Sequence, residues 1–197
     1  MSIRGLLMII ALIFCSSGAV VAQLGELNWD EHKMNFINGN HNLPEIVESH
    51  QAVALIFLDP ECPNCQKYGA TFRALDSAFS SQQVALVGVF PFSSQKKESI
   101  QRFVTDYTFK FPQVLDSDHD WVKATGVNTT PEAVLITKEG DILYRGAVNN
   151  WFYDLGQYRR QVTKHYLVDA VHSFLNEKPV QTSETEAIGC LIGKHVH

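Results

Sequence analysis

Residues 52–68, AVALIFLDPECPNCQKY, carry the strongest structural signal in the chain. It begins with an unbroken apolar run, Ala52–Leu58, which is bounded by turn-forming residues and therefore predicts a strand buried on both faces of a sheet. Two cysteines separated by two residues, Cys62 and Cys65, follow directly. Such a pair can be a metal-ligand set, a structural disulfide or a reactive dithiol, and its surroundings decide between them.

Pro63 indicates that a helix begins immediately after Cys62, because the missing N–H of proline costs nothing at the first helical position. Cys62 then lies where unpaired backbone N–H groups and the positive end of the helix dipole stabilise a thiolate. Cys65 lies one turn further along, close enough to form a disulfide and more deeply buried. The spacing predicts an attacking thiol, Cys62, and a resolving thiol, Cys65. It favours a reactive dithiol over an inert bridge or half of a zinc site.

Two acidic residues, Asp59 and Glu61, flank the pair. We expect them to oppose formation of the Cys62 thiolate, because nearby carboxylates raise the pKa of a thiol. A less stabilised thiolate gives a less stabilised reduced form and a lower reduction potential. The sequence therefore predicts a dithiol that is more reducing than that of a strong oxidant.

Patterns typical of strands and of amphipathic helices alternate along the rest of the chain. The predicted strands are Ala52–Leu58, Val84–Phe90, Glu132–Thr137 and Ile142–Gly146. The predicted helices are Leu43–His50, one from Pro63 that includes Phe79, Lys96–Tyr107, Asp118–Val127 and His165–Glu177. The alternation predicts an α/β fold with a parallel core, to which the last two strands add an antiparallel hairpin.

The length of 197 residues fits one domain with extensions. We expect a signal peptide at 1–22, an N-terminal arm at 23–44 and a single domain at 45–177. We also expect an ordered insertion at about 147–164, and a C-terminal tail at 178–197 that contains Cys190.

The first 22 residues predict export. They carry one arginine, an apolar run over Leu6–Phe14 and small residues before a cut at Gln23, as in a secretory signal. The rival is a lipoprotein cut before Cys15, which the bulky Phe14 disfavours. The predicted location is therefore the periplasm or the extracellular space, with membrane attachment only if Cys15 is lipidated.

Charge and cysteine count narrow the function further. The formal net charge is −5 and no cluster of Lys and Arg stands out, which argues against a nucleic-acid partner. Of the four cysteines, Cys15 would leave with the signal. The remaining three are an odd set for an exported protein, so one thiol has no obvious disulfide partner.

The chain from about Glu45 to Gly146 resembles the thioredoxin-like redoxins, the group that holds TlpA-type thiol–disulfide oxidoreductases and AhpC/TSA proteins. The resemblance rests on Cys62-Pro63-Asn64-Cys65, on Thr130-Pro131 and on the order of strands and helices. It implies a central mixed sheet flanked by helices, disulfide exchange at Cys62 and a cis bond before Pro131 that faces the dithiol. Such a bond would expose the backbone of Thr130 for pairing with an extended substrate; an ordinary trans proline is the alternative.

The chain also departs from both groups. Glu61 stands where TlpA-type proteins have tryptophan. The peroxiredoxin pattern Pro-x-x-x-Thr-x-x-Cys, placed on Cys62, finds Leu55 and Asp59 instead, and placed on Cys65 it fails as well. A thiol peroxidase is therefore only the third interpretation. The segment after residue 146 looks like an extension found in a subgroup of exported bacterial redoxins.

Cys190, in the apolar segment AIGCLIG, has three interpretations: an inert packed thiol, a relay or resolving thiol that exchanges with Cys62 or with another subunit, or a metal ligand. Cys62, Cys65 and Cys190 with His195 or His197 would make a soft set suited to Cu(I) or zinc. No local spacing requires such a site, and copper-delivering redoxins use a Cys-x-x-x-Cys pair.

Taken together, these observations predict an exported thiol–disulfide oxidoreductase with no required cofactor. Cys62 would attack a disulfide of a partner protein and Cys65 would resolve the mixed disulfide, while Pro63, Thr130 and Pro131 would bind the substrate. The expected partners are protein thiols and disulfides, including an electron donor or acceptor. The alternative is a copper-binding or metal-delivery redoxin.

Overall fold

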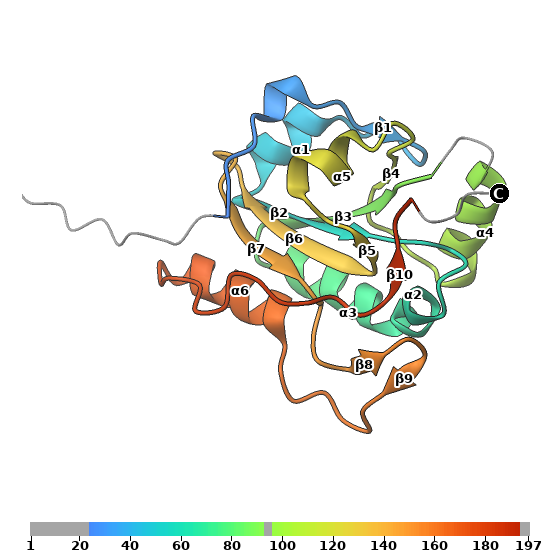
Figure 1. The fold of residues 1–197 in the computed structure, drawn as a ribbon. Helices are drawn as coiled ribbons and strands as arrows, with labels where there is room; N and C mark the ends of the chain where they lie inside the picture. Colours follow the sequence, from blue (N-terminus) through green and yellow to red (C-terminus); the bar gives the residue numbers. More distant parts are fainter. Residues whose placement is uncertain (1–23, 93–95, 194–197) are drawn as a thin grey trace, which may run out of the picture.

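The computed structural model describes residues 24–92 and 96–193, and its centre is a six-stranded mixed sheet with the order β1-β4-β3-β2-β6-β7 (Figure 1). The strands of this sheet are β1 (Asn35–Phe36), β2 (Ala52–Phe57), β3 (Val84–Phe90), β4 (Gln113–Leu115), β6 (Glu132–Thr137) and β7 (Ile142–Gly146). Strands β2, β3 and β4 are parallel, and β1, β6 and β7 pair antiparallel with their neighbours. The predicted α/β fold with a mixed sheet is confirmed.

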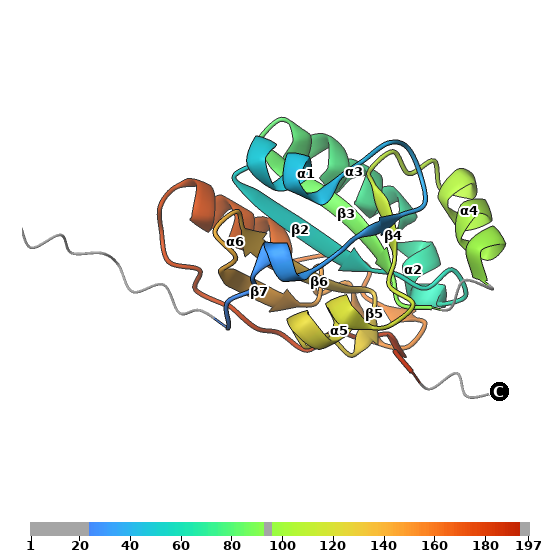
Figure 2. The ribbon, with the colours of Figure 1, turned by 90° about the horizontal axis from the view of Figure 1, so that it is seen from above.

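Helices cover both faces of this sheet, with α1 and α5 on one side and α3 and α6 on the other (Figures 1 and 2). The helices are η1 (Trp29–Glu31), α1 (Leu43–Ser49), α2 (Pro63–Lys67), α3 (Gly69–Ser80), α4 (Lys97–Asp106), α5 (Asp120–Thr125) and α6 (Tyr166–Leu175). Side chains of β2 alternate between the two cores. Ile56 joins the core beneath α3, and Leu55 joins the core beneath α1 and α5. A strand buried on both faces explains the unbroken apolar run.

Two strands of the sheet were not predicted. β4 has three residues and β1 has two, which is too short for an alternating pattern to emerge. β1 pairs with β4, so residues 24–44, expected to form an arm, contribute a strand to the central sheet. The expected boundary at residue 45 falls inside α1, and β1 lies on its N-terminal side.

The helix expected from Pro63 is broken. α2 ends at Lys67 and α3 begins at Gly69, with Tyr68 between them. The buried Tyr68 ring donates a hydrogen bond from its hydroxyl to Asn149 Oδ1, 2.6 Å away. The break thus lies where the segment 147–164 packs against the dithiol helix.

The segment 147–164 forms a small hairpin of β8 (Phe152–Asp154) and β9 (Gln157–Tyr158). A further two-stranded pair joins β5 (Thr129–Thr130) to β10 (Cys190–Leu191). In Figure 1 the red C-terminal segment runs past β7 to reach β5 beside α2. Both segments after residue 146 therefore meet the end of the sheet where the dithiol lies.

Within the described ranges, no helix has the length and apolar character needed to cross a bilayer. The predicted signal peptide lies outside the described residues.

Candidate active site

Cys62 is the residue before the first turn of α2, as predicted, with Pro63 at the first helical position. Its backbone oxygen accepts from Gln66 N at 3.1 Å, and its own N–H bonds to Asp59 O at 3.2 Å. Strand β2 ends five residues earlier, at Phe57, so Cys62 lies just beyond the carboxyl end of this strand. The sulfur therefore faces the unpaired N–H groups at the start of a helix.

Cys65 lies one turn further along α2 and is fully buried. Its sulfur accepts a hydrogen bond from Asp59 N at 3.4 Å. Burial raises the pKa of the Cys65 thiol, and the neighbouring Cys62 raises it further. Cys65 consequently stays protonated when Cys62 ionises, which suits a resolving thiol that reacts second.

The pKa of Cys62 is lowered to about 5. The largest cause is the hydrogen bond that the Cys65 thiol donates to it, and burial acts in the opposite direction. The Cys190 thiol and backbone N–H groups of α2 lower the pKa further. Cys62 Sγ also lies 3.1 Å from Thr130 O, which accepts only from the protonated thiol. We assign a net downward shift because several donors face the sulfur and one acceptor opposes them.

The expectation that Asp59 and Glu61 would raise the pKa of Cys62 is wrong. Neither carboxylate is among the causes of the Cys62 shift. The Asp59 charge instead acts on Cys65 and Cys190 and raises the pKa of each as the smallest of the causes, while the Asp59 backbone N–H lowers the pKa of Cys65. Glu61 pairs with Lys96 at 3.1 Å on the surface, so its charge is compensated. The argument for an unusually reducing dithiol loses its basis.

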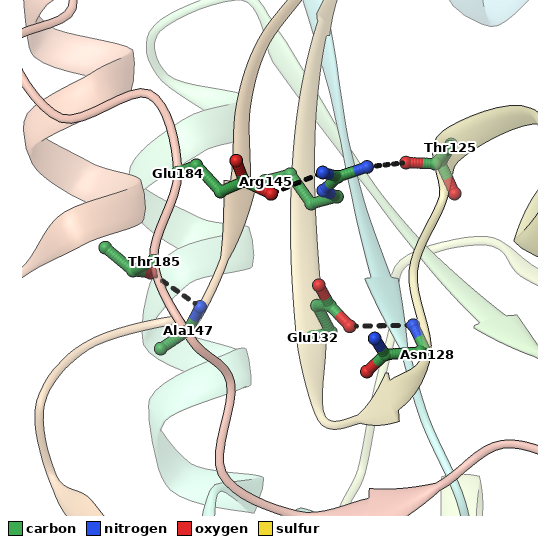
Figure 3. A network of polar contacts seen from close by, with 7 residues as sticks. All are labelled: Thr125, Asn128, Glu132, Arg145, Ala147, Glu184 and Thr185. Atoms are coloured by element: carbon green, nitrogen blue, oxygen red, sulfur yellow. Dashed lines mark hydrogen bonds and ion pairs between the residues drawn. The ribbon is translucent and has the colours of Figure 1, made fainter. Parts of the chain in front are cut away.

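The Thr130–Pro131 peptide bond is cis, as the resemblance implied, and it faces the dithiol. Thr130 is buried, and its carbonyl oxygen points at Cys62 Sγ. The carboxylate of Glu132 holds this loop, because it accepts from Asn128 N at 3.0 Å and from Thr129 N at 3.1 Å (Figure 3). Burial raises the pKa of Glu132.

Cys190 is brought to the same place by the pairing of β10 with β5, in which Cys190 lies opposite Thr130. Thr130 O in turn lies 3.1 Å from Cys62 Sγ, and the Cys190 thiol is one of the groups that lower the pKa of Cys62. All three cysteines that the structure describes are free thiols. Of the sequence-predicted site residues, Cys62, Pro63, Cys65, Thr130, Pro131 and Cys190 therefore lie together.

The part of the chain that the structure describes does not form the metal site considered from the sequence. Among residues 24–92 and 96–193, no group of three or more His, Cys, Asp and Glu side chains has the arrangement of a metal site. His195 and His197 lie outside the described residues.

Two residues of the site escaped the sequence analysis. The buried Asn64, noted only as a spacer in the dithiol motif, donates from Nδ2 to Ile188 O at 2.8 Å and accepts from Gly156 N at 3.0 Å. It joins the C-terminal tail and the 147–164 segment to the dithiol helix. Glu132 follows Pro131 directly, and an acid opening an apolar strand was the signal that could have marked it.

The lowered pKa of Cys62 predicts a measurable titration. We expect a thiolate absorbance change with a midpoint near pH 5 in the reduced protein, absent in Cys62→Ser. In Cys190→Ser the midpoint should move upward, because one donor is lost. A midpoint near 8.5 would contradict the assigned geometry.

The same pKa shift predicts how the stability of the fold depends on pH. A group whose pKa is lowered on folding stabilises the fold fully above its unfolded pKa, about 8.5 for cysteine. That contribution disappears as the pH falls through 5.

Comparisons with known proteins identify relatives of the chain. The model of the AhpC/TSA family matches residues 28–145. The thiol-disulfide oxidoreductase ResA of Halalkalibacterium halodurans is 28% identical over 93 residues, which are 47% of this chain and 52% of that protein. The sporulation thiol-disulfide oxidoreductase A of Bacillus subtilis is 31% identical over 93 residues, 47% of this chain and 56% of the relative. The chain thus spans about half the length of these relatives.

A hypothetical protein from Sinorhizobium meliloti is a similar solved structure. It superposes with a TM-score of 0.72 and 24% identity, and the match covers 87% of this chain and 92% of that one. At this identity the likeness shows a shared fold.

Proposed function

The chain belongs to the AhpC/TSA family, and we propose that within this family it is an exported thiol–disulfide oxidoreductase that exchanges disulfides with partner proteins. The observation that carries the proposal is the pair of thiols at the start of α2. One thiol has a pKa lowered to about 5 and faces a cis-proline loop, and its mate is fully buried with a raised pKa. Both curated relatives are named as thiol-disulfide oxidoreductases.

In the proposed reaction, the Cys62 thiolate attacks one sulfur of a partner disulfide. A Cys62–partner bond forms and the other partner sulfur leaves as a thiolate. Cys65 then loses its proton and attacks Cys62, which releases the partner and leaves a Cys62–Cys65 disulfide. The partner gains the two electrons that the dithiol loses. An electron donor must then reduce the Cys62–Cys65 disulfide before the next cycle. In the opposite direction, the same disulfide oxidises a partner dithiol.

The site supports exchange better than peroxide reduction. Leu55 and Asp59 occupy the positions where a peroxidatic Cys62 would need proline and threonine. Asp59 is buried beside the dithiol, and its carboxylate accepts from Glu61 N at 2.9 Å. Export rests on the predicted signal at 1–22.

Trapping a mixed disulfide tests the proposal. In a chain carrying Cys15→Ser, Cys65→Ser and Cys190→Ser, Cys62 is the remaining thiol, so its adduct with insulin should persist. Mass spectrometry should show this adduct, joined through Cys62. The matched chain with Cys62→Ser in place of Cys65→Ser should form almost none, because the raised pKa of Cys65 keeps that thiol protonated. Equal trapping by both chains would contradict the assigned roles. Copper and zinc content, measured on the unsubstituted chain, reports on the metal-delivery alternative.

A further inference from the structure

The proposed exchange meets an obstacle in the structure, because the attacking thiol is covered. The exposed fraction of Cys62 is 0%. The backbone of Thr130, where an extended substrate would pair, is already paired with β10 of the same chain. A partner protein therefore cannot reach Cys62 in this conformation.

The C-terminal strand is placed as a substrate strand would be. β10 runs antiparallel to β5, with Cys190 opposite Thr130 and Leu191 opposite Thr129. The pairing continues past the strand through Ile192 N, which donates to Asn128 O at 2.9 Å. Cys190 thus lies opposite Thr130, whose carbonyl oxygen is 3.1 Å from Cys62 Sγ.

Gly189 allows this close approach. A Cβ atom at residue 189 would lie 1.9 Å from Thr130 O, so any other side chain would push β10 off the loop. From the dithiol helix, Asn64 donates to Ile188 O at 2.8 Å. The tail is therefore held on both sides of the site, by the cis-proline loop and by Asn64 of the dithiol helix.

The tail is also held before it reaches the site. Glu184 pairs with Arg145 of β7, which in turn donates to Thr125 O at 3.1 Å (Figure 3). Backbone bonds join Arg145 to Ser183 and Thr185, and Thr185 Oγ1 accepts from Ala147 N at 3.0 Å. These contacts keep the tail near the site when β10 leaves β5.

From this geometry we infer that β10 is an internal substrate strand and that Cys190 is a third exchange cysteine, which forms a disulfide with Cys62. The inference rests on the proposed function. Its consequence is that an external partner reaches Cys62 only when β10 has left the loop, so the tail competes with partner proteins for one groove.

The chemistry balances without a further reactant. Starting from the Cys62–Cys65 disulfide, the Cys190 thiolate attacks Cys62 Sγ. The Cys62–Cys190 bond forms, the Cys62–Cys65 bond breaks, and Cys65 leaves as a thiolate that takes up a proton. No electrons are gained or lost overall. Starting from a Cys62–partner mixed disulfide, the same attack releases the partner thiolate.

The charge on Cys62 is one of the causes that keep the Cys190 thiol protonated. Burial raises the pKa of Cys190 to about 12, and the hydrogen bond and charge of Cys62 contribute. Once Cys62 is part of a disulfide it carries no charge, so that contribution disappears. Cys190 then ionises more readily when Cys62 is ready to be attacked.

Disulfide mapping tests the inference. A chain with Cys15→Ser and Cys65→Ser is treated with oxidised glutathione and digested with trypsin without reduction. We expect a linked pair of peptides, residues 34–67 with 165–194, which carry Cys62 and Cys190. Adding Cys190→Ser should abolish the link and leave glutathione on Cys62. Glutathione on Cys62 with Cys190 free in the first chain would overturn the inference.

A second measurement does not depend on the internal disulfide. In the chain with Cys62 as its remaining cysteine, Gly189→Val should speed glutathione capture at Cys62 about tenfold, because β10 loses its place. Leu191→Val, two residues along and 45% exposed, is the matched control and should change the rate less than twofold. Equal rates of glutathione capture by the two variants would show that β10 does not limit access to Cys62.

These outcomes separate the two proposals. If Cys62 takes up no glutathione even with Gly189→Val, the proposed function fails. If Cys62 takes it up but the 34–67 and 165–194 peptides never link, only the role of Cys190 fails.

Discussion

Replacing Cys62 with serine is expected to lower the rate of insulin disulfide reduction by roughly a thousandfold or more. The attacking species is a thiolate that the site stabilises, since the pKa of Cys62 is lowered to about 5. A serine hydroxyl has nearly the same size but does not ionise near neutral pH, so hydrogen bonds from Cys65 and from the start of α2 have no anion to stabilise. The measurement is turnover with dithiothreitol as the reductant, compared with the Cys15→Ser parent.

The control is the stability of the variant. Serine fits the space of Cys62, so at about pH 4, where the parent's thiolate contributes no stability, the free energy of unfolding in urea should change by about 1 kcal/mol or less. A variant that keeps more than a tenth of the parent's turnover would remove Cys62 from the role of nucleophile. Peroxide consumption that requires Cys62, without insulin turnover, would support the thiol peroxidase interpretation instead.

Trp121→Ala is expected to destabilise the protein by about 3–5 kcal/mol. Trp121 lies on α5, is 1% exposed and joins the core between α1, α5 and the sheet. Its ring is 6.0 Å from Trp29 and 5.2 Å from His32 between centroids, and its indole N–H donates to Lys33 O at 3.0 Å. Removing it therefore leaves a cavity and an unpaired acceptor where the N-terminal segment meets α5.

Urea unfolding of the reduced protein measures this loss. Lys123→Ala, on the same helix, is the control, because the Lys123 side chain is 70% exposed and its ion pair with Asp120 spans 3.7 Å at the surface. We expect its effect to be within about 0.5 kcal/mol. A loss below about 1 kcal/mol for Trp121→Ala would mean that residues 24–44 are not packed on α5 as described.

The dithiol and its immediate setting could be predicted because their signals are local. A continuous apolar run predicted the strand β2, and Pro63 predicted where the next helix begins, so the position of Cys62 followed from a few adjacent residues. The cis bond before Pro131 depended on the family resemblance rather than on any local pattern. The effect of Asp59 was predicted for the wrong thiol, because sequence proximity does not say which sulfur a carboxylate faces.

The amino-acid sequence is enough to predict the order of the main strands and helices and the pairing of a cysteine at a helix N-terminus with a buried mate. Only the tertiary structure decided that β10 lies on the cis-proline loop, with Cys190 opposite Thr130 and Gly189 against Thr130 O. The physical reason is that a two-residue strand has no periodicity of its own, and its place is set by hydrogen bonds to residues 60 positions away in the chain. Whether the attacking thiol is open or covered is therefore a property of long-range packing.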